Sequence, residues 1–177
     1  KAGFVKNWKK TLKGLESDPA TVAALAPRLQ AAFTDHDIPP VPIFIRKQTA
    51  DEKVGGENAH WDSAGFVVVS DDAAEEDGYR SKVADLASDR KSTVKQAYPD
   101  QMTGLMVHEM GHKFHDDNPH TLSNARAVLS NPANKKRVAA AISDYASSHP
   151  QELVAEAYAM SKHPDFKALP EATRSLV

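Results

Sequence analysis

The sequence predicts an α+β fold, with helices at both ends of the chain and a small sheet between them. Its 177 residues, 41% hydrophobic and 26% charged, suit one globular domain spanning 1–177. β-branched and aromatic runs are confined to residues 41–70, whereas apolar residues elsewhere recur at helical spacing. We therefore expect a helical part over 1–40, sheet and loops over 41–100, and a second helical part over 101–177.

The first forty residues are expected to form helices. Apolar side chains recur every three or four positions over residues 4–15 and again over residues 22–33. Asp18 followed by Pro19 is typical of a helix start, because proline fits the first helical position. Pro27 lacks a backbone donor, so it is expected to kink or split the second helix.

The middle of the chain is predicted to form a small antiparallel sheet. Residues 41–47 ("VPIFIRK") are β-branched and aromatic, which favours a strand. Residues 49–58 are polar and contain two adjacent glycines, so a loop is expected there. Residues 58–61 ("NAHW") and 65–70 ("GFVVVS") are predicted strands joined by a turn. Residues 71–78 form an acidic stretch without EF-hand spacing and are expected to be a solvated loop.

The remainder of the chain, from about residue 80, is predicted to be helical. Prolines that follow Asn or His are expected to separate its helices. These pairs are Asn118-Pro119, Asn131-Pro132, His149-Pro150 and His163-Pro164. Asp100 is the expected N-cap of the helix that ends at Asn118, and five apolar residues give that helix a hydrophobic face. These five are Met102, Leu105, Met106, Met110 and Phe114.

Composition excludes several classes of protein. A net charge of −2 gives no broad basic surface, so we expect no nucleic-acid partner. No apolar run approaches the roughly 20 residues of a membrane span. The absence of cysteine excludes disulfides, thiolate zinc sites and thiol nucleophiles. The chain begins at Lys1 without a signal-like segment, so we expect a mature form or an excised domain of a longer polypeptide.

The segment "LMVHEMGHKF" contains the pattern H-E-x-x-H. His108 and His112 lie one helical turn apart, so both imidazoles can reach the same metal ion. Glu109 is offset by one position and can take a proton from a metal-bound water. Catalytic zinc needs one more protein ligand and an open position. Gly111 costs about 1 kcal/mol of helix propensity relative to Ala, which would be explained by close packing of another backbone there.

Three arrangements could supply the third ligand. The extended pattern H-E-x-x-H-x-x-G-x-x-H is excluded, because His115 occupies its glycine position and Asn118 its last histidine position. Asp116 or Asp117 could close the site, but both stand at the end of the helix, where the approach is awkward. The third arrangement takes a glutamate from a later helix. We expect His115 to lie at the surface.

Glu152 and Glu156 favour the third arrangement. They are four residues apart in "SSHPQELVAEAYAM", so their carboxylates share one helical face. Two stacked carboxylates repel each other unless a positive group neutralises them. A zinc ion bound by Glu152, with Glu156 accepting the N–H of a ligand histidine, would neutralise the pair.

These motifs together resemble the gluzincin metallopeptidases. Tyr145, seven residues before Glu152 in "DYASSHPQELVAEAYA", is similar to the tyrosine that precedes E-x-x-A-E-[AV]-[FY] in the anthrax lethal factor and Pro-Pro endopeptidase group. The resemblance implies a zincin-like fold, in which the small sheet packs on the H-E-x-x-H helix. It also implies one Zn²⁺ per chain and an oxyanion-stabilising role for Tyr145.

A second resemblance concerns the predicted strand Asn58, Ala59, His60 and Trp61. "NAHW" is similar to the N-A-F-W edge strand of thermolysin-like enzymes, which hydrogen-bonds the substrate backbone, although His60 replaces the aromatic residue. It implies that an extended peptide pairs with these four residues. The resemblances together cover about residues 58–160, and the first forty residues match no family.

The resemblance implies a zinc-dependent endopeptidase with Glu109 as general base and a protein or peptide as its substrate. One alternative is a zinc-stabilised binding or structural module of a toxin or phage polypeptide, although such a module needs neither Glu109 nor Tyr145. Another is a hydrolase that acts on a different kind of substrate. We expect the protein to be secreted or delivered from a bacterium, with a cytoplasmic location as the alternative.

Overall fold

A computed structural model describes residues 14–55, 58–71, 101–162, 166–167 and 169–177. Within these ranges the architecture is mixed α+β, with seven helices and a three-stranded sheet, as the sequence predicts. The helices are α2 (Pro19–Asp35), α3 (Ala50–Gly55), α6 (Gln101–Asp117), α7 (His120–Ser130), α8 (Pro132–Ala141), α9 (Pro150–Ser161) and α10 (Glu171–Arg174). The strands are β1 (Ile43–Arg46), β2 (Ala59–Asp62) and β3 (Phe66–Ser70).

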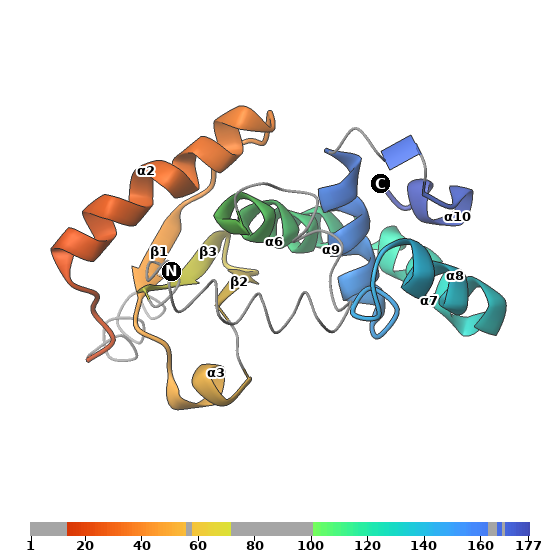
Figure 1. Ribbon diagram of the computed structural model, residues 1–177, viewed down its shortest axis with the longest axis horizontal. Helices are drawn as coiled ribbons and strands as arrows, with labels where there is room; N and C mark the ends of the chain where they lie inside the picture. The colour runs from red at the N-terminus through yellow and green to blue at the C-terminus, as the bar shows by residue number, and fades with distance from the viewer. Residues whose placement is uncertain (1–13, 56–57, 72–100, 163–165, 168) are drawn as a thin grey trace.

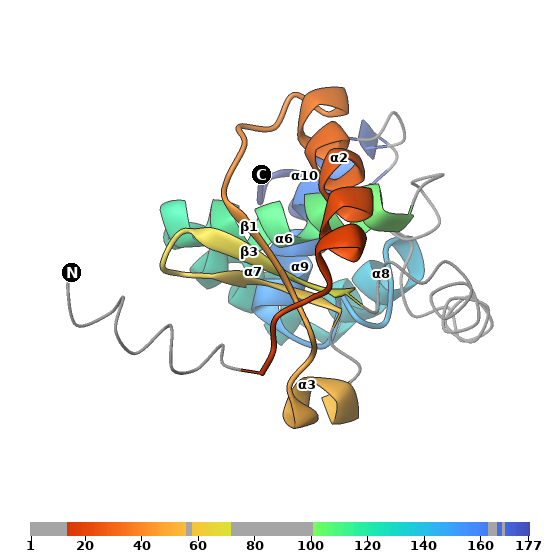
Figure 2. The same cartoon turned by 90° about the vertical axis from the view of Figure 1, so that its left-hand side faces the viewer.

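Helix α6 lies at the centre of this arrangement. It contacts α2, the edge strand β2 and the C-terminal helices α7 and α9 (Figure 1). A view turned by 90° shows the strands crossing in front of α6 (Figure 2). None of the described helices is both long enough and apolar enough to cross a membrane.

The sheet has the strand order β1-β3-β2 and is mixed, so the prediction of a purely antiparallel sheet is wrong. β2 and β3 form the predicted antiparallel hairpin, in which Trp61 faces Val67. β1 pairs with β3 in parallel, with Ile43 opposite Val67. β3 is buried along its whole length, which suits the central strand of a sheet. Because β2 occupies one side of β3 through the hairpin, β1 takes the opposite side.

Helix α3 lies in the stretch 49–58, for which a loop was the prediction. Thr49 and Glu52 form a capping box at its start. The Glu52 N–H donates to Oγ1 of Thr49 at 3.3 Å, and the Thr49 N–H donates to Oε2 of Glu52 at 2.7 Å. The Arg46 guanidinium also binds the Glu52 carboxylate and lowers its pKa to about 2. The pattern T-x-x-E at residues 49–52 is the sequence signal for this helix.

Proline acts differently in two of the helices. Asn131 caps α8 by accepting the N–H groups of Ala133 and Asn134 at 2.9 and 3.3 Å, ahead of Pro132 at the first helical position. In α2, by contrast, the helix continues through Pro27, so the helix is not split there. Pro27 is exposed to solvent, where water can satisfy the carbonyl that loses its partner, and the opposite, buried face of α2 packs on the core.

Several predicted features lie outside the described residues. They are the helix over residues 4–15 except for its last two residues, most of the acidic stretch, the start of the C-terminal helical part, the Asp100 cap and the pair His163-Pro164.

Helices α6 and α9 meet at Gly111. A β-carbon at this position would lie 2.5 Å from the Cα and 2.7 Å from the carbonyl oxygen of Ala155. Only a residue without a side chain allows such an approach, so the expectation of a closely packed backbone is confirmed. Every residue of α9 from Leu153 to Met160 except Tyr158 is buried. The contact places Glu152 and Glu156, on either side of Ala155, against the H-E-x-x-H helix.

Substitution Gly111→Ala tests this contact. Helix propensity alone would stabilise the protein by about 1 kcal/mol. We expect the opposite sign, a loss of about 1–3 kcal/mol in the free energy of unfolding, because the added methyl group overlaps the α9 backbone. Urea denaturation of both proteins measures the difference. Ser123→Ala, at an exposed position of α7, is the control and should change stability little; a more stable Gly111→Ala variant would contradict the contact.

Candidate metal centre

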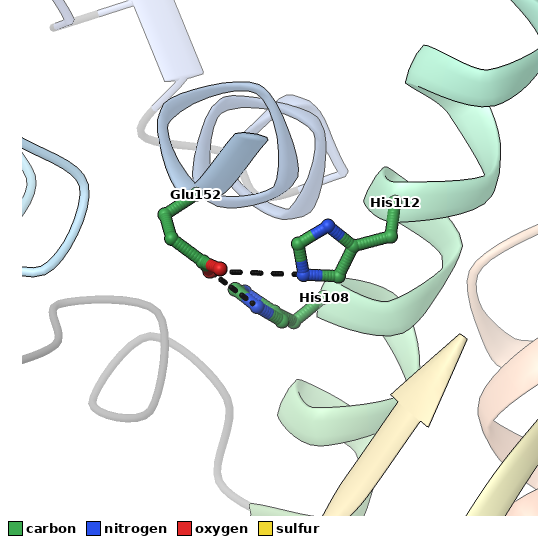
Figure 3. Close-up of side chains that lie close together, drawn as sticks. All are labelled: His108, His112 and Glu152. Atoms are coloured by element: carbon green, nitrogen blue, oxygen red, sulfur yellow. Dashed lines mark ion pairs between the residues drawn. The ribbon is translucent and has the colours of Figure 1, made fainter. Parts of the chain in front are cut away.

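Two elements build the candidate site. α6 carries His108 and His112 one turn apart, while its apolar residues Met106, Val107 and Met110 are buried in the core. α9 supplies Glu152. Figure 3 shows the Glu152 carboxylate reaching toward both imidazoles. One ligand atom from each of the three site residues lies within 4.8 Å of the others, so the group could hold a metal ion.

The distances within this group suit a small metal ion. Oε2 of Glu152 lies 3.3 Å from Nε2 of His108 and 3.6 Å from Nε2 of His112. Ligand atoms at 2.0–2.2 Å from a tetrahedral ion are about 3.4 Å apart. Oε2 of Glu152 is also buried without a hydrogen-bond partner of good geometry. A buried carboxylate oxygen in that condition is strongly unfavourable unless a cation is nearby.

Glu156 lies on the far side of His108 from this group. Its Oε1 is 3.2 Å from Nδ1 of His108, and the side chain is 2% exposed. This is the position that the sequence predicts for it. A carboxylate at Nδ1 orients the ring and leaves Nε2, 3.3 Å from Oε2 of Glu152, as the possible ligand atom.

The two histidines have opposite protonation tendencies. Burial opposes the charge on His108, but Glu152 and Glu156 outweigh it and raise the pKa of His108 to about 10. Burial, together with the charge on His108, lowers the pKa of His112 to about 4. Without a metal ion, one proton is therefore held between His108 and the two carboxylates. Because a metal binds neutral imidazole, a cation at this centre would replace that proton.

Glu109, the predicted general base, is buried next to the three possible metal ligands. Its Oε2 accepts the backbone N–H of Trp61 at 2.8 Å. This bond joins α6 to β2 and fixes the orientation of the Glu109 carboxylate.

Tyr145 lies in the segment between α8 and α9, beside the possible ligand His108. Its ring centroid is 6.1 Å from that of His108, and the residue is 46% exposed. Burial of the hydroxyl and the negative charge of Glu152 raise the pKa of Tyr145. The phenol therefore keeps its proton at neutral pH and can donate a hydrogen bond.

Of the residues predicted to bind substrate, three lie on the edge strand β2 and Asn58 directly precedes it, but not all of their side chains face His108, His112 and Glu152. Ala59 and Trp61 pack against the core. The His60 side chain is instead near Glu52 of α3, with Nδ1 3.7 Å from Oε1. Asn58 uses its carbonyl to accept the Ser70 N–H at 2.8 Å. Of these side chains, that of Trp61 contacts a polar group of α6, the Asp116 carboxylate.

The alternative third ligands have other partners. Asp117 is exposed and forms an ion pair with Lys113 one turn earlier. Asp116 accepts the indole N–H of Trp61 on its Oδ2 at 2.8 Å. Neither aspartate belongs to the group of ligand atoms around His108 and His112.

His115 is buried, with 8% exposure, so the prediction that it lies at the surface is wrong. Its Nε2 is 3.2 Å from Nδ1 of His112. Burial lowers the pKa of His115, which favours a neutral ring. The sequence signal for this contact is the three-residue spacing from His112, which places both on one helical face.

Replacing Glu152 tests whether it is the third ligand. We expect Glu152→Gln to lower zinc affinity at least about 100-fold, because a neutral amide is a weak zinc ligand. Asp117→Asn is the matched control and should bind zinc as the wild type does. Competition with a chromophoric chelator measures both affinities. Equal loss in the two variants, or loss only in Asp117→Asn, would contradict the two-helix site.

Comparison of the chain with protein-family models, with curated proteins and with solved structures found no match. Inferences about the site therefore depend on its residues and their geometry. That geometry brings together two imidazoles, three buried or half-buried carboxylates and a protonated phenol.

Proposed function

We propose that the protein is a zinc-dependent endopeptidase of gluzincin type, with a zincin-like arrangement of the sheet on α6. The observation that carries the proposal is the convergence of His108 and His112 from α6 with Glu152 from α9, directly beside the buried carboxylate of Glu109. A site with only a structural task needs no such carboxylate.

The donor set favours zinc. Magnesium and calcium prefer oxygen ligands alone, whereas zinc is commonly bound by two imidazoles and one carboxylate. Iron(II) also binds two histidines and a carboxylate, but octahedrally, with neighbouring ligand atoms about 3.0 Å apart. The separations of 3.3 and 3.6 Å here are closer to a tetrahedral ion. Three protein ligands leave one position open, as in catalytic zinc sites.

Each remaining group has a chemical task in peptide hydrolysis. Zinc, when bound, would lower the pKa of its water toward about 7. Glu109, buried beside these ligands, would accept the proton of that water and deliver it to the leaving amine. The Trp61 N–H, 2.8 Å from Oε2, keeps the Glu109 carboxylate in one orientation throughout. Tyr145, protonated at neutral pH, can donate to the oxyanion that develops on the scissile carbonyl.

The edge strand β2 supports a peptide as the substrate. The outer edge of β1 is bridged by Glu16, whereas no described strand pairs with the outer edge of β2. In an antiparallel pair, alternate residues direct their backbone groups away from the partner strand. The Trp61 N–H points away from β3 and donates to Glu109. The outer edge of β2 therefore lies next to the proposed general base. An extended chain pairing there would pass directly over the site.

Substitution Glu109→Gln separates catalysis from metal binding. The amide oxygen of Gln can still accept the Trp61 N–H, so we expect one zinc per chain. Because Gln cannot act as a base, the rate of peptide cleavage should fall at least about 100-fold. Mass spectrometry of a proteome-derived peptide library incubated with each protein measures this rate. Glu171→Gln, on α10 away from the site, should cleave normally.

Normal peptide cleavage by Glu109→Gln would contradict the proposed mechanism. A wild-type protein that binds zinc, is stabilised by it and cleaves nothing would instead indicate a binding module.

A further inference from the structure

His115 is a buried titratable group that the proposed mechanism does not use. It lies on the last turn of α6, three residues after His112, with 8% exposure. A buried imidazole needs partners for both of its ring nitrogens.

Both ring nitrogens of His115 face polar atoms. Nε2 lies 3.2 Å from Nδ1 of His112. Nδ1 lies 3.2 Å from Oδ1 of Asp116, within ion-pair distance although outside good hydrogen-bond geometry. The other oxygen of Asp116 accepts the indole N–H of Trp61 at 2.8 Å. A continuous row of polar contacts therefore runs from His112 to the edge strand β2.

The chemistry of imidazole allows one arrangement of protons along this row. A neutral imidazole has one N–H donor and one acceptor nitrogen. If Nε2 of His112 binds the metal, its Nδ1 carries the hydrogen and needs an acceptor. Nε2 of His115 is the atom in reach, at 3.2 Å. The proton of His115 is then on Nδ1, the nitrogen that lies 3.2 Å from Oδ1 of the negatively charged Asp116.

The two ligand histidines consequently have different partners. His108 faces the Glu156 carboxylate directly, at 3.2 Å. His112 faces a neutral ring, and a carboxylate only beyond it. Outer partners of this kind usually change metal affinity 10–100-fold.

We propose that His115 is a positioning residue for His112: it accepts the Nδ1–H of that ligand and holds it in the tautomer whose Nε2 can bind the metal. The inference rests on the proposed zinc site but assigns no step in hydrolysis to His115. Trp61, which fixes Glu109 through its backbone, also fixes Asp116 through its indole, so the strand β2 supports both the base and the second histidine ligand.

Nuclear magnetic resonance of the zinc-loaded full chain tests the tautomer directly. Long-range ¹H–¹⁵N correlation spectra should show the His112 proton on Nδ1, protected from solvent exchange, and the His115 proton on Nδ1. This experiment needs no variant, so it remains decisive if substitution of the buried residue impairs folding. A zinc-loaded wild type whose His112 Nδ1 proton exchanges freely, or whose His115 carries its proton on Nε2, would overturn the proposal.

Zinc affinity, measured by chelator competition, provides a second readout. His115→Phe keeps the ring volume but removes the acceptor, and should bind zinc about 10–100-fold more weakly. His115→Gln restores an acceptor oxygen and should recover most of that loss, which a purely structural role would not produce. His120→Phe, at an exposed position of α7, is the control and should match the wild type.

The outcomes separate this inference from the proposed function. A wild type that binds zinc and cleaves peptides, with His115→Phe equal to it in affinity, would overturn only the role of His115. A wild type that binds no zinc would overturn both.

Discussion

The contact between Gly111 and the backbone of Ala155 is the constraint on which the site depends. A β-carbon at Gly111 would lie only 2.5 Å from the Cα of Ala155, so the two helices are closer than side chains would allow. Glu152 and Glu156 flank this point of closest approach, and each reaches one nitrogen of His108. The glycine weakens α6 by about 1 kcal/mol, and burial of most of α9 offsets that cost.

The same contact concentrates charge in a buried place. Glu109, Glu152 and Glu156 lie around two imidazoles, with Glu109 and Glu156 only 4% and 2% exposed. Carboxylates in such surroundings repel one another and lose hydration, so the cluster is stable only with a positive group among them. A proton on His108 satisfies this requirement in the metal-free protein, and a divalent cation held by His108, His112 and Glu152 would also satisfy it. β2 completes the arrangement, since Trp61 holds Glu109 and Asp116 at once.

Local periodicity made much of the site predictable from the sequence. His108, His112, Glu152 and Glu156 follow helical spacing, and the structure brings them together as expected. The parallel pairing of β1 was not predictable, because strand order depends on which side of β3 the hairpin leaves available. The burial of His115 arises from tertiary packing around the end of α6, which spacing alone does not reveal. Helix α3, in contrast, had a local signal in the capping box of Thr49 and Glu52.

We propose that His108, His112 and Glu152, from α6 and α9, bind one ion through two imidazoles and one carboxylate. X-ray absorption at the zinc edge of the zinc-loaded protein tests it most directly. We expect four nitrogen or oxygen ligands at about 2.0–2.2 Å, with the outer-shell scattering of two imidazole rings. A six-coordinate ion, or scattering from fewer than two imidazoles, would contradict it.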